Sequence, residues 1–208
     1  MITAPNLAEL NWLRHGFGGR DSVYPEIITT LRQIHSCLVV EVEGTGGDRI
    51  AEGDGLVTDQ RGMLVGIRTA DCVPVLLADP VNRVVSAVHA GWRGTASRIV
   101  PEAVERMKSR FGTRPEHVVA AIGPSIGGCC YEVGPVVARQ FGTWVPNMEQ
   151  VDEPALLDLK TVNQLQLASL GVRDVWVSQD CTFCGSDFFS FRREKEQAGR
   201  MISYIGID

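Results

Sequence analysis

The chain contains 208 residues, 44% of them hydrophobic, and carries a formal net charge of −5. That content can bury the core of one domain, so we expect residues 1–208 to form a single domain. The acidic balance argues against nucleic acid as the main partner, because phosphate binding needs a basic face. No apolar run reaches the roughly 18 residues of a membrane span, and residues 1–6 lack a signal-peptide pattern. We therefore expect a cytoplasmic protein with no membrane contact.

Six short apolar runs have the length and the Gly, Pro, Asp or Asn boundaries that are typical of strands. They cover residues 38–42, 63–67, 73–78, 84–89, 118–122 and 175–177. No helical segment separates the runs between residues 38 and 89, whereas a doubly wound nucleotide fold needs strand–helix alternation there. The glycine motifs of dinucleotide-binding and P-loop folds are also absent from the sequence.

Helical patterning covers residues 96–111, 135–141 and 155–170. In the first of these segments the apolar residues share one face. Thr95 or Ser97 could cap its start, and Gly112 could end it. Because strands outnumber helices and the helices are scattered, the sequence predicts an α+β fold.

Six cysteines occur, and without a secretion signal we expect reduced thiols, some of them metal ligands. Cys181 and Cys184 have the C-x-x-C spacing. A four-cysteine zinc site would need a second pair, and the adjacent Cys129 and Cys130 offer poor geometry for it. We therefore interpret the C-x-x-C pair as structural.

Two of the four histidines and one further cysteine are candidate metal ligands. Cys72 and His89 each lie where a predicted strand gives way to a loop or turn. Imidazole and thiolate are the ligands that zinc prefers, and three protein ligands leave one position open. The alternative for each residue is a packed core side chain, and the spacing of His35, Cys72 and His89 forms no local metal motif.

Gly91 and Gly94 flank Trp92 and Arg93 directly before a predicted helix. Glycines let the backbone approach a ligand closely, and a helix N-terminus favours anions. Arg93 could therefore bind a phosphate or carboxylate group. The alternative is a tight turn in which Arg93 pairs with a surface acid.

Several short motifs follow one another along almost the whole chain. They are Arg-His-Gly-Phe at 14–17, Gln-Ile-His at 33–35, Asp-Gly-Leu-Val-Thr at 54–58, Thr-Ala-Asp-Cys at 69–72, His-Ala-Gly-Trp-Arg-Gly at 89–94, Gly-Pro-Ser-Ile at 123–126, Tyr-Glu-Val-Gly at 131–134 and Phe-Phe-Ser-Phe-Arg-Arg at 188–193. Together they resemble the multicopper polyphenol oxidase or laccase-domain family, also described as purine nucleoside phosphorylase-like or peptidoglycan editing factor proteins. The resemblance implies a sandwich of mixed β-sheets with helices packed outside.

The resemblance also supplies the ligand set. The matching His, Cys and His of the family share one zinc ion, which implies that His35, Cys72 and His89 bind one Zn²⁺ per chain. Family members are similar to enzymes that phosphorolyse adenosine, inosine and methylthioadenosine and that deaminate adenosine. A purine nucleoside and phosphate are therefore the expected partners of a monomer or weak homodimer.

Further roles are assigned on the same basis. We expect Arg93 to bind phosphate, with Arg20, Gly91 and Gly94 as further substrate-binding residues. Asp71 is the candidate for proton transfer, and its alternative role is to support the ligand Cys72. The segment 18–32 is shorter than in many members, which bears on substrate selectivity, and Ser36 replaces a glycine that is common after the ligand histidine.

Four other functions stay open. Cys72 and His89 could form a metal-free cysteine hydrolase, in which neither zinc nor His35 is needed. A hydrolase of a nucleotide-sugar amide, as in peptidoglycan precursor editing, is a related alternative. Copper-dependent polyphenol oxidation is less favoured, because four histidines are few for a multicopper centre. A non-catalytic zinc module would need a fourth ligand, such as Cys37 or Cys130.

Overall fold

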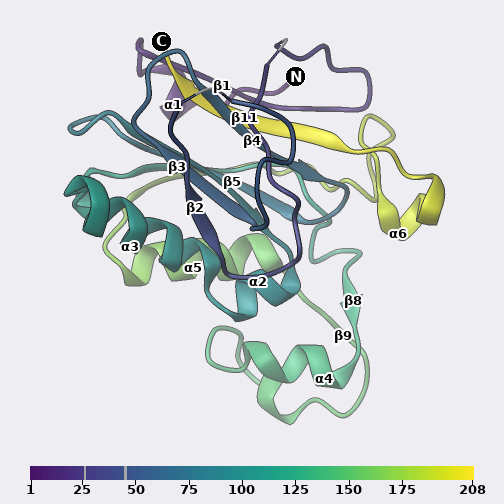
Figure 1. The fold of residues 1–208 in the computed structure, drawn as a ribbon. Helices are drawn as coiled ribbons and strands as arrows, with labels where there is room; N and C mark the ends of the chain where they lie inside the picture. Colours follow the sequence, from purple (N-terminus) through teal and green to yellow (C-terminus); the bar gives the residue numbers. More distant parts are fainter. Residues whose placement is uncertain (26, 45) are drawn as a thin grey trace.

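The chain folds into three layers, which a computed structural model describes for residues 1–25, 27–44 and 46–208. A six-stranded mixed sheet forms the middle layer. Helices α3 (Ile99–Phe111) and α5 (Leu159–Ser169) pack against one of its faces, and a three-stranded antiparallel sheet packs against the other (Figure 1). The predicted α+β sandwich with outer helices is confirmed.

The middle sheet has the strand order β10-β7-β5-β6-β3-β2. Antiparallel pairing joins β5 to both β6 and β7 and joins β6 to β3, and the outer pairs β2–β3 and β7–β10 are parallel. Its strands are β2 (Val39–Glu41), β3 (Gly55–Thr58), β5 (Val73–Asp79), β6 (Val84–Ala90), β7 (Val119–Ile122) and β10 (Asp174–Val177). Five of these strands coincide closely with predicted apolar runs, whereas β3 was not predicted.

The smaller sheet has the order β1-β11-β4. Its strands are β1 (Leu13–Phe17), β4 (Leu64–Thr69) and β11 (Met201–Ile207). Only β4 was predicted from the sequence. The last strand of the chain therefore lies between two strands from its first third, and β4 leads directly from this sheet into β5 of the middle sheet.

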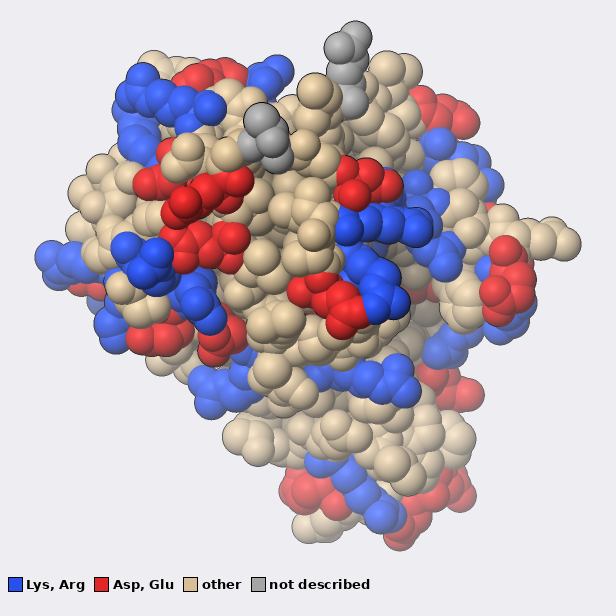
Figure 2. Space-filling view, in the orientation of Figure 1, with Lys and Arg blue, Asp and Glu red and all other residues tan. Residues whose placement is uncertain are grey.

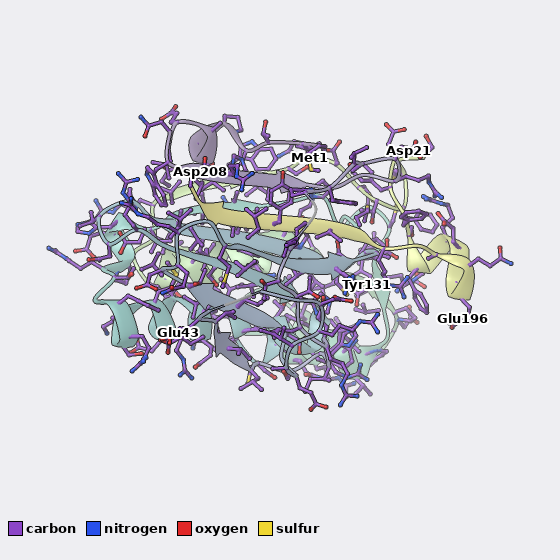
Figure 3. All side chains as sticks on the ribbon, turned by 45° about the horizontal axis from the view of Figure 1, so that its top comes forward. Met1, Asp21, Glu43, Tyr131, Glu196 and Asp208 are labelled. Atoms are coloured by element: carbon purple, nitrogen blue, oxygen red, sulfur yellow. The ribbon has the colours of Figure 1, made fainter. Side chains whose placement is uncertain are left out.

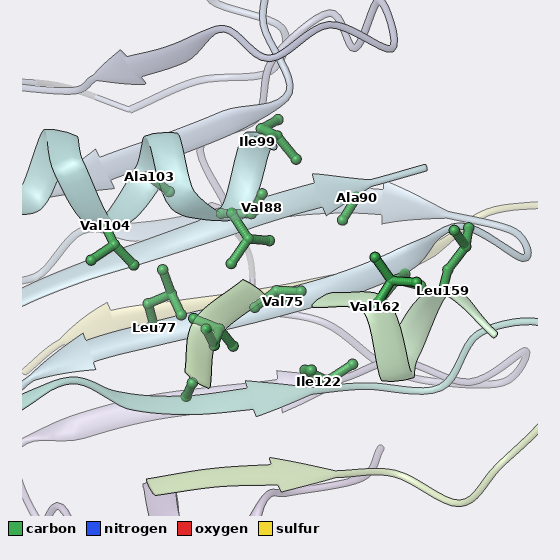
Figure 4. Packing of buried hydrophobic residues seen from close by; sticks show 14 of the residues in the cluster. Val75, Leu77, Val88, Ala90, Ile99, Ala103, Val104, Ile122, Leu159 and Val162 are labelled. Atoms are coloured by element: carbon green, nitrogen blue, oxygen red, sulfur yellow. The ribbon is translucent and has the colours of Figure 1, made fainter. Parts of the chain in front are cut away.

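Both faces of the middle sheet are buried, so its central strands β5 and β6 are buried at every position and are mostly apolar. Val75 and Leu77 of β5 pack against α3 and α5, while Leu76 and Ala78 of the same strand pack against the smaller sheet. Figure 4 shows the helix-side cluster, in which side chains of α3 and α5 meet those of β5, β6 and β7. This rigid sheet fixes the strand ends at which the site is built.

Two predicted helices begin later than expected. The helix predicted at 96–111 is α3, which begins only at Ile99; residue 96 is the last residue of a separate short helix, α2 (Trp92–Ala96). The two helices are distinct because Arg98 between them has a left-handed φ of 63°. Arg98 itself occupies the N-cap position of α3, so neither Thr95 nor Ser97 caps it, whereas Gly112 ends the helix with a φ of 72° as predicted. The helix predicted at 155–170 begins at Leu159, because Asp158 caps it.

The remaining elements are short. Residues Ala155–Leu156 form strand β9, which pairs with β8 (Glu132–Val133) instead of starting a helix. The predicted helix at 135–141 is α4 (Pro135–Ala138) followed by a 3₁₀ turn. The remaining short helices are α1 (Pro5–Ala8) and α6 (Phe191–Glu194), and further 3₁₀ turns lie at Pro115–His117, Met148–Gln150 and Lys195–Gln197. Among the helices in the described part of the chain, none is both long and apolar enough to cross a membrane.

Candidate metal centre and its pocket

Two histidines and one cysteine meet at the ends of strands in the middle sheet. His35 lies in the loop before β2, Cys72 lies in the turn between β4 and β5, and His89 lies near the end of β6. Their ligand atoms all lie within 4.8 Å of one another, and the two imidazole rings meet edge to face with centroids 5.0 Å apart. The fold thus brings together three residues that no local spacing links, and they could hold a metal ion.

Strand pairing sets the centre of this group. Pro74 of β5 is paired with His89 of β6, so Cys72 just before β5 comes close to Gly91 just after β6. A Cβ atom on Gly91 would lie 3.1 Å from Cys72 Sγ and 3.4 Å from His35 Cδ2. The glycine therefore keeps space free between the three side chains.

The buried carboxylate of Asp54 orients the histidines. It accepts hydrogen bonds from His89 Nδ1 at 2.8 Å, from the backbone N–H of His35 at 3.0 Å, and from the N–H and hydroxyl of Ser36 at 2.7 Å each. Burial opposes its ionisation, but the hydrogen bonds from His89 and Ser36 outweigh burial and lower the pKa of Asp54 to about 2. Because Nδ1 of His89 is held in this way, Nε2 is the ring atom left to face the site.

The charges of Cys72 and His89 reinforce each other. Burial alone would raise the pKa of the Cys72 thiol, but the charge of His89 and hydrogen bonds from both histidines lower this pKa to about 6. Burial alone would lower the pKa of His89, but the Cys72 thiolate and Asp54 raise it to about 9. Cys72 is therefore available at neutral pH as a thiolate, which is the form that binds metal or attacks as a nucleophile.

The carboxylate of Asp71 is fully engaged by donors from the C-terminal part of the chain. Its Oδ1 accepts a hydrogen bond from the Thr182 hydroxyl at 2.6 Å, and its Oδ2 accepts from the Ser190 hydroxyl at 3.1 Å and the Arg192 N–H at 2.6 Å. These contacts hold Asp71 at a φ of 83°, a conformation that non-glycine residues rarely adopt. The arrangement favours support of the neighbouring Cys72 over the proton-transfer role predicted for Asp71.

The three candidate ligands open into a cavity of about 690 Å³. Trp92, Tyr131 and Phe191 give it aromatic surface, and Arg192 of α6 stacks over Tyr131 with its guanidinium 5.2 Å from the ring centroid. In Figure 3, Tyr131 lies beside the ends of the sheets, on the side where the helical segment that contains α6 is found. Six arginines line the cavity: Arg32, Arg49, Arg68, Arg93, Arg192 and Arg200. Apolar walls with clustered guanidinium groups suit a flat ring system joined to, or bound beside, an anion.

The guanidinium group of Arg93 is available to a ligand. It is exposed, it lies 4.5 Å from the centroid of the Trp92 ring, and no carboxylate in the described part of the chain forms an ion pair with it. By contrast, Arg68 pairs with Asp48 and Arg32 pairs with Glu52 at the same cavity. The alternative in which Arg93 pairs with a surface acid is thus not observed. Figure 2 shows acidic and basic side chains interleaved over the visible face.

Two predicted substrate-binding residues do not line the cavity. Arg20 forms an ion pair with Glu194 at 2.5 Å, donates to the Phe188 carbonyl and stacks over Phe189. A Cβ atom on Gly94 would lie 3.2 Å from the Ser36 carbonyl oxygen and from Ile99, which explains this glycine by tight packing. Gly91 lies at the centre of the ligand group, and Arg93, Asp71 and Cys72 line the cavity.

Asp54 and Tyr131 are the main site residues that the sequence analysis missed. Both belong to motifs that carry the family resemblance, at 54–58 and 131–134, but neither was given a role. Burial and the negative charge of Cys72 raise the pKa of Tyr131 to about 12, so its hydroxyl stays protonated and can donate a hydrogen bond.

A second group of possible metal ligands lies outside this cavity. The sulfur atoms of Cys129, Cys130, Cys181 and Cys184 all lie within 4.8 Å of one another. The expectation that the adjacent pair has poor geometry for a four-cysteine site was therefore wrong. Cys130 belongs to this second group, and Cys37 is a free, exposed thiol, so neither completes the group around Cys72.

The fold and the site define a three-layer α+β protein with a three-residue candidate metal centre at the floor of an arginine-lined cavity. Residues 19–208 match the family described as multi-copper polyphenol oxidoreductase laccase. The chain belongs to this family, as its motifs indicated.

Relatives and a solved structure agree with this assignment. The chain is 46% identical to a purine nucleoside phosphorylase of Deinococcus radiodurans over 182 residues, which cover 85% of this chain and 69% of the relative. It is 37% identical to adenosine deaminase RL5 from an unknown prokaryotic organism, over 84% of this chain and 72% of the relative. The crystal structure of the Bacillus licheniformis hypothetical protein YfiH has a TM-score of 0.87 at 28% identity, covering 100% of this chain and 98% of that one.

Proposed function

We propose that this protein is a zinc-dependent purine nucleoside phosphorylase that also deaminates adenosine. The observation that carries the proposal is the convergence of His35, Cys72 and His89 on one point of an arginine-lined cavity. The names of the similar phosphorylase and deaminase supply the substrate class. Adenosine, inosine and methylthioadenosine are the proposed substrates, in a cytoplasmic monomer or weak homodimer.

The donor set fits one zinc ion. Two imidazoles and a thiolate are among the ligands that zinc prefers, and Asp54 fixes the ring of His89 as carboxylates do behind zinc-bound histidines. Three protein ligands leave a position open for substrate or water. When bound, zinc supplies Lewis-acid chemistry and lowers the pKa of water to about 7. Copper is less favoured, since the group contains only two histidines.

The residues of the cavity divide the remaining work. We assign phosphate to Arg93, whose guanidinium has no carboxylate partner among the described residues. Trp92, Tyr131 and Phe191 would hold the purine by stacking, and the protonated Tyr131 hydroxyl can donate to a ring nitrogen or to the leaving group. Asp71, with both oxygens engaged, positions Cys72.

A specific observation keeps a second function open. Cys72, His89 and Asp54 form a chain of thiolate, imidazole and carboxylate that resembles the nucleophile, base and orienting acid of cysteine hydrolases. A nucleotide-sugar amide would suit the same cavity, because its diphosphate can bind several arginines. In this function His35 would have no catalytic role.

The test measures zinc content and adenosine turnover, with and without phosphate, for the unmodified chain, His35→Ala and the control His117→Ala. His117 lies in a 3₁₀ turn outside the cavity. We expect His35→Ala to lose both the zinc of this centre and the turnover, and His117→Ala to keep both. Phosphate-dependent release of adenine identifies phosphorolysis, and phosphate-independent inosine identifies deamination. Full activity of His35→Ala in a chelator would instead support the cysteine hydrolase.

A further inference from the structure

Four cysteines that the proposed function does not use come together from two loops. Cys129 and Cys130 lie in the loop that follows β7, and Cys181 and Cys184 lie in the loop that follows β10. These two strands are parallel neighbours at one edge of the middle sheet, so their following loops leave the sheet at the same end. An isolated bridge between Ser125 and Cys181, with the Thr182 N–H donating to the Ser125 carbonyl at 3.0 Å, joins the two loops.

The sulfur atoms have the spacing of ligands around a shared ion. Four thiolates at about 2.3 Å from a tetrahedral zinc ion lie about 3.8 Å from one another. Here Cys129 Sγ lies 3.8 Å from Cys184 Sγ, Cys130 Sγ lies 3.2 Å from Cys184 Sγ, and all four sulfurs lie within 4.8 Å of one another. The adjacent pair Cys129–Cys130 can contribute two ligands because Cys130 lies in a tight turn, with its N–H donating to the Gly127 carbonyl at 3.0 Å.

The surrounding backbone is shaped for thiolates. The Gly127 N–H donates to Cys181 Sγ at 3.2 Å, a contact that stabilises a negative sulfur. A Cβ atom on Gly127 would lie 3.3 Å from Cys129 Sγ and 3.6 Å from Cys181 Sγ, so this glycine leaves room at the sulfur cluster. On the other loop the Gly185 N–H donates to the Cys181 carbonyl at 2.9 Å, which folds the C-x-x-C segment so that both thiols face the same side.

We propose that Cys129, Cys130, Cys181 and Cys184 bind a second, structural zinc ion, separate from the centre of His35, Cys72 and His89. Four protein ligands close the coordination shell, which is the property of structural zinc sites, and four soft thiolates select zinc or iron over harder metals. Each ligand thiol loses its proton when it binds zinc. Because each of the two loops contributes two of the ligands, the ion would join the loop after β7 to the loop after β10.

The position of this site gives it a consequence for the cavity. Thr182, between two of the proposed ligands, donates its hydroxyl to Asp71 at 2.6 Å. Ile126, shortly before the other pair, donates its N–H to the Asp71 carbonyl at 3.0 Å, and Tyr131 follows that pair into the cavity wall. The second ion would therefore stabilise the two loops that hold Asp71 and form one side of the cavity.

The experiment counts zinc in the full chain after purification under reducing conditions. We expect about two zinc ions per chain, and about one in each of His35→Ala and Cys184→Ser. The matched control is Cys37→Ser, which replaces an exposed free thiol outside both groups and should keep both ions. The double variant of His35→Ala and Cys184→Ser should keep none. This count does not depend on the proposed activity, because the second ion should remain in His35→Ala even if no nucleoside is turned over.

A second measurement covers the case in which Cys184→Ser does not fold. The His35→Ala chain, with all four cysteines intact, is loaded with cobalt(II) in place of zinc. We expect the intense visible and near-ultraviolet absorption of tetrahedral cobalt with four thiolates, and its loss when zinc is added back. The reduced and zinc-saturated chain is also examined by intact mass spectrometry. Detection of disulfides among the four cysteines would overturn the proposal. Free thiols without metal under the same conditions, or iron as the bound metal, would also overturn it.

Discussion

Replacing Asp54 by Asn tests whether the buried carboxylate prepares the metal centre. The substitution keeps the shape of the side chain but removes the charge that holds His89 Nδ1 and the Ser36 hydroxyl. The lowering of the pKa of Asp54 from 3.8 to about 2 corresponds to about 2 kcal/mol of preference for the carboxylate in the folded chain. Loss of such an orienting partner typically lowers metal affinity about 10- to 100-fold. We expect a loss in this range for zinc at the His35–Cys72–His89 centre.

The assay is a competition titration of zinc against a chromophoric chelator at pH 7, using chains in which Cys184→Ser removes the second candidate site. Asp79→Asn is the matched control, because Asp79 is equally buried and accepts hydrogen bonds in a turn at the opposite end of β5 from Cys72. This control should lower thermal stability without changing zinc affinity. Unchanged zinc affinity in Asp54→Asn, in a chain that still folds, would refute the orienting role.

Three further outcomes are expected at the same centre. Gly91→Ala places a Cβ atom 3.1 Å from Cys72 Sγ, while the backbone angles of Gly91 suit alanine. Zinc affinity, measured by titration, should therefore fall at least about tenfold, and the melting temperature, measured by calorimetry, should change little. Arg93→Gln removes a charge-assisted hydrogen bond, so the KM for phosphate should rise about 10- to 100-fold while deamination is unchanged, with Arg110→Gln on α3 as the control in the same kinetic assays. Zinc affinity should rise with pH, about tenfold per unit between pH 6 and 9. The pKa of His89 is raised to about 9 and that of Cys72 is lowered to about 6, so one proton, on His89, must leave when zinc binds in this range. Calorimetric titration in buffers of different ionisation enthalpy should show release of that proton, and a zinc affinity that does not change with pH would contradict the assignment.

Five of the six strands of the middle sheet were predictable because both of its faces are buried. The largely apolar runs at 73–78 and 84–89 can be recognised without knowing which strands they pair with. Strands β3 and β11 contain glycine or serine at positions where a neighbouring strand approaches, as at Gly206, where a Cβ atom would lie 2.3 Å from the Met63 carbonyl oxygen. Such residues interrupt the apolar pattern, and their place in a sheet depends on partners far away in the sequence.

The candidate metal centre was predictable only through the resemblance to a family. His35, Cys72 and His89 come from three separate segments, so their distances follow from strand pairing and from no local spacing. The role of Asp54 depends on the pairing of Gly55 with Val88, which sets the carboxylate beside the His89 ring. The error about the four-cysteine group has the same origin, since the parallel pairing of β7 with β10 brings its two loops together.

Strand β11 has a consequence for how the chain matures during synthesis. Residues 201–207 lie between β1 and β4, so these two early strands gain this shared partner only after residues 201–207 have left the ribosome. Until then β4 presents an open edge, which invites pairing with other chains. The contacts of Asp71 with Thr182, Ser190 and Arg192 likewise form only after those later residues have been made. The nascent polypeptide thus carries the candidate thiol and imidazole ligands ahead of the strands and loops that arrange them.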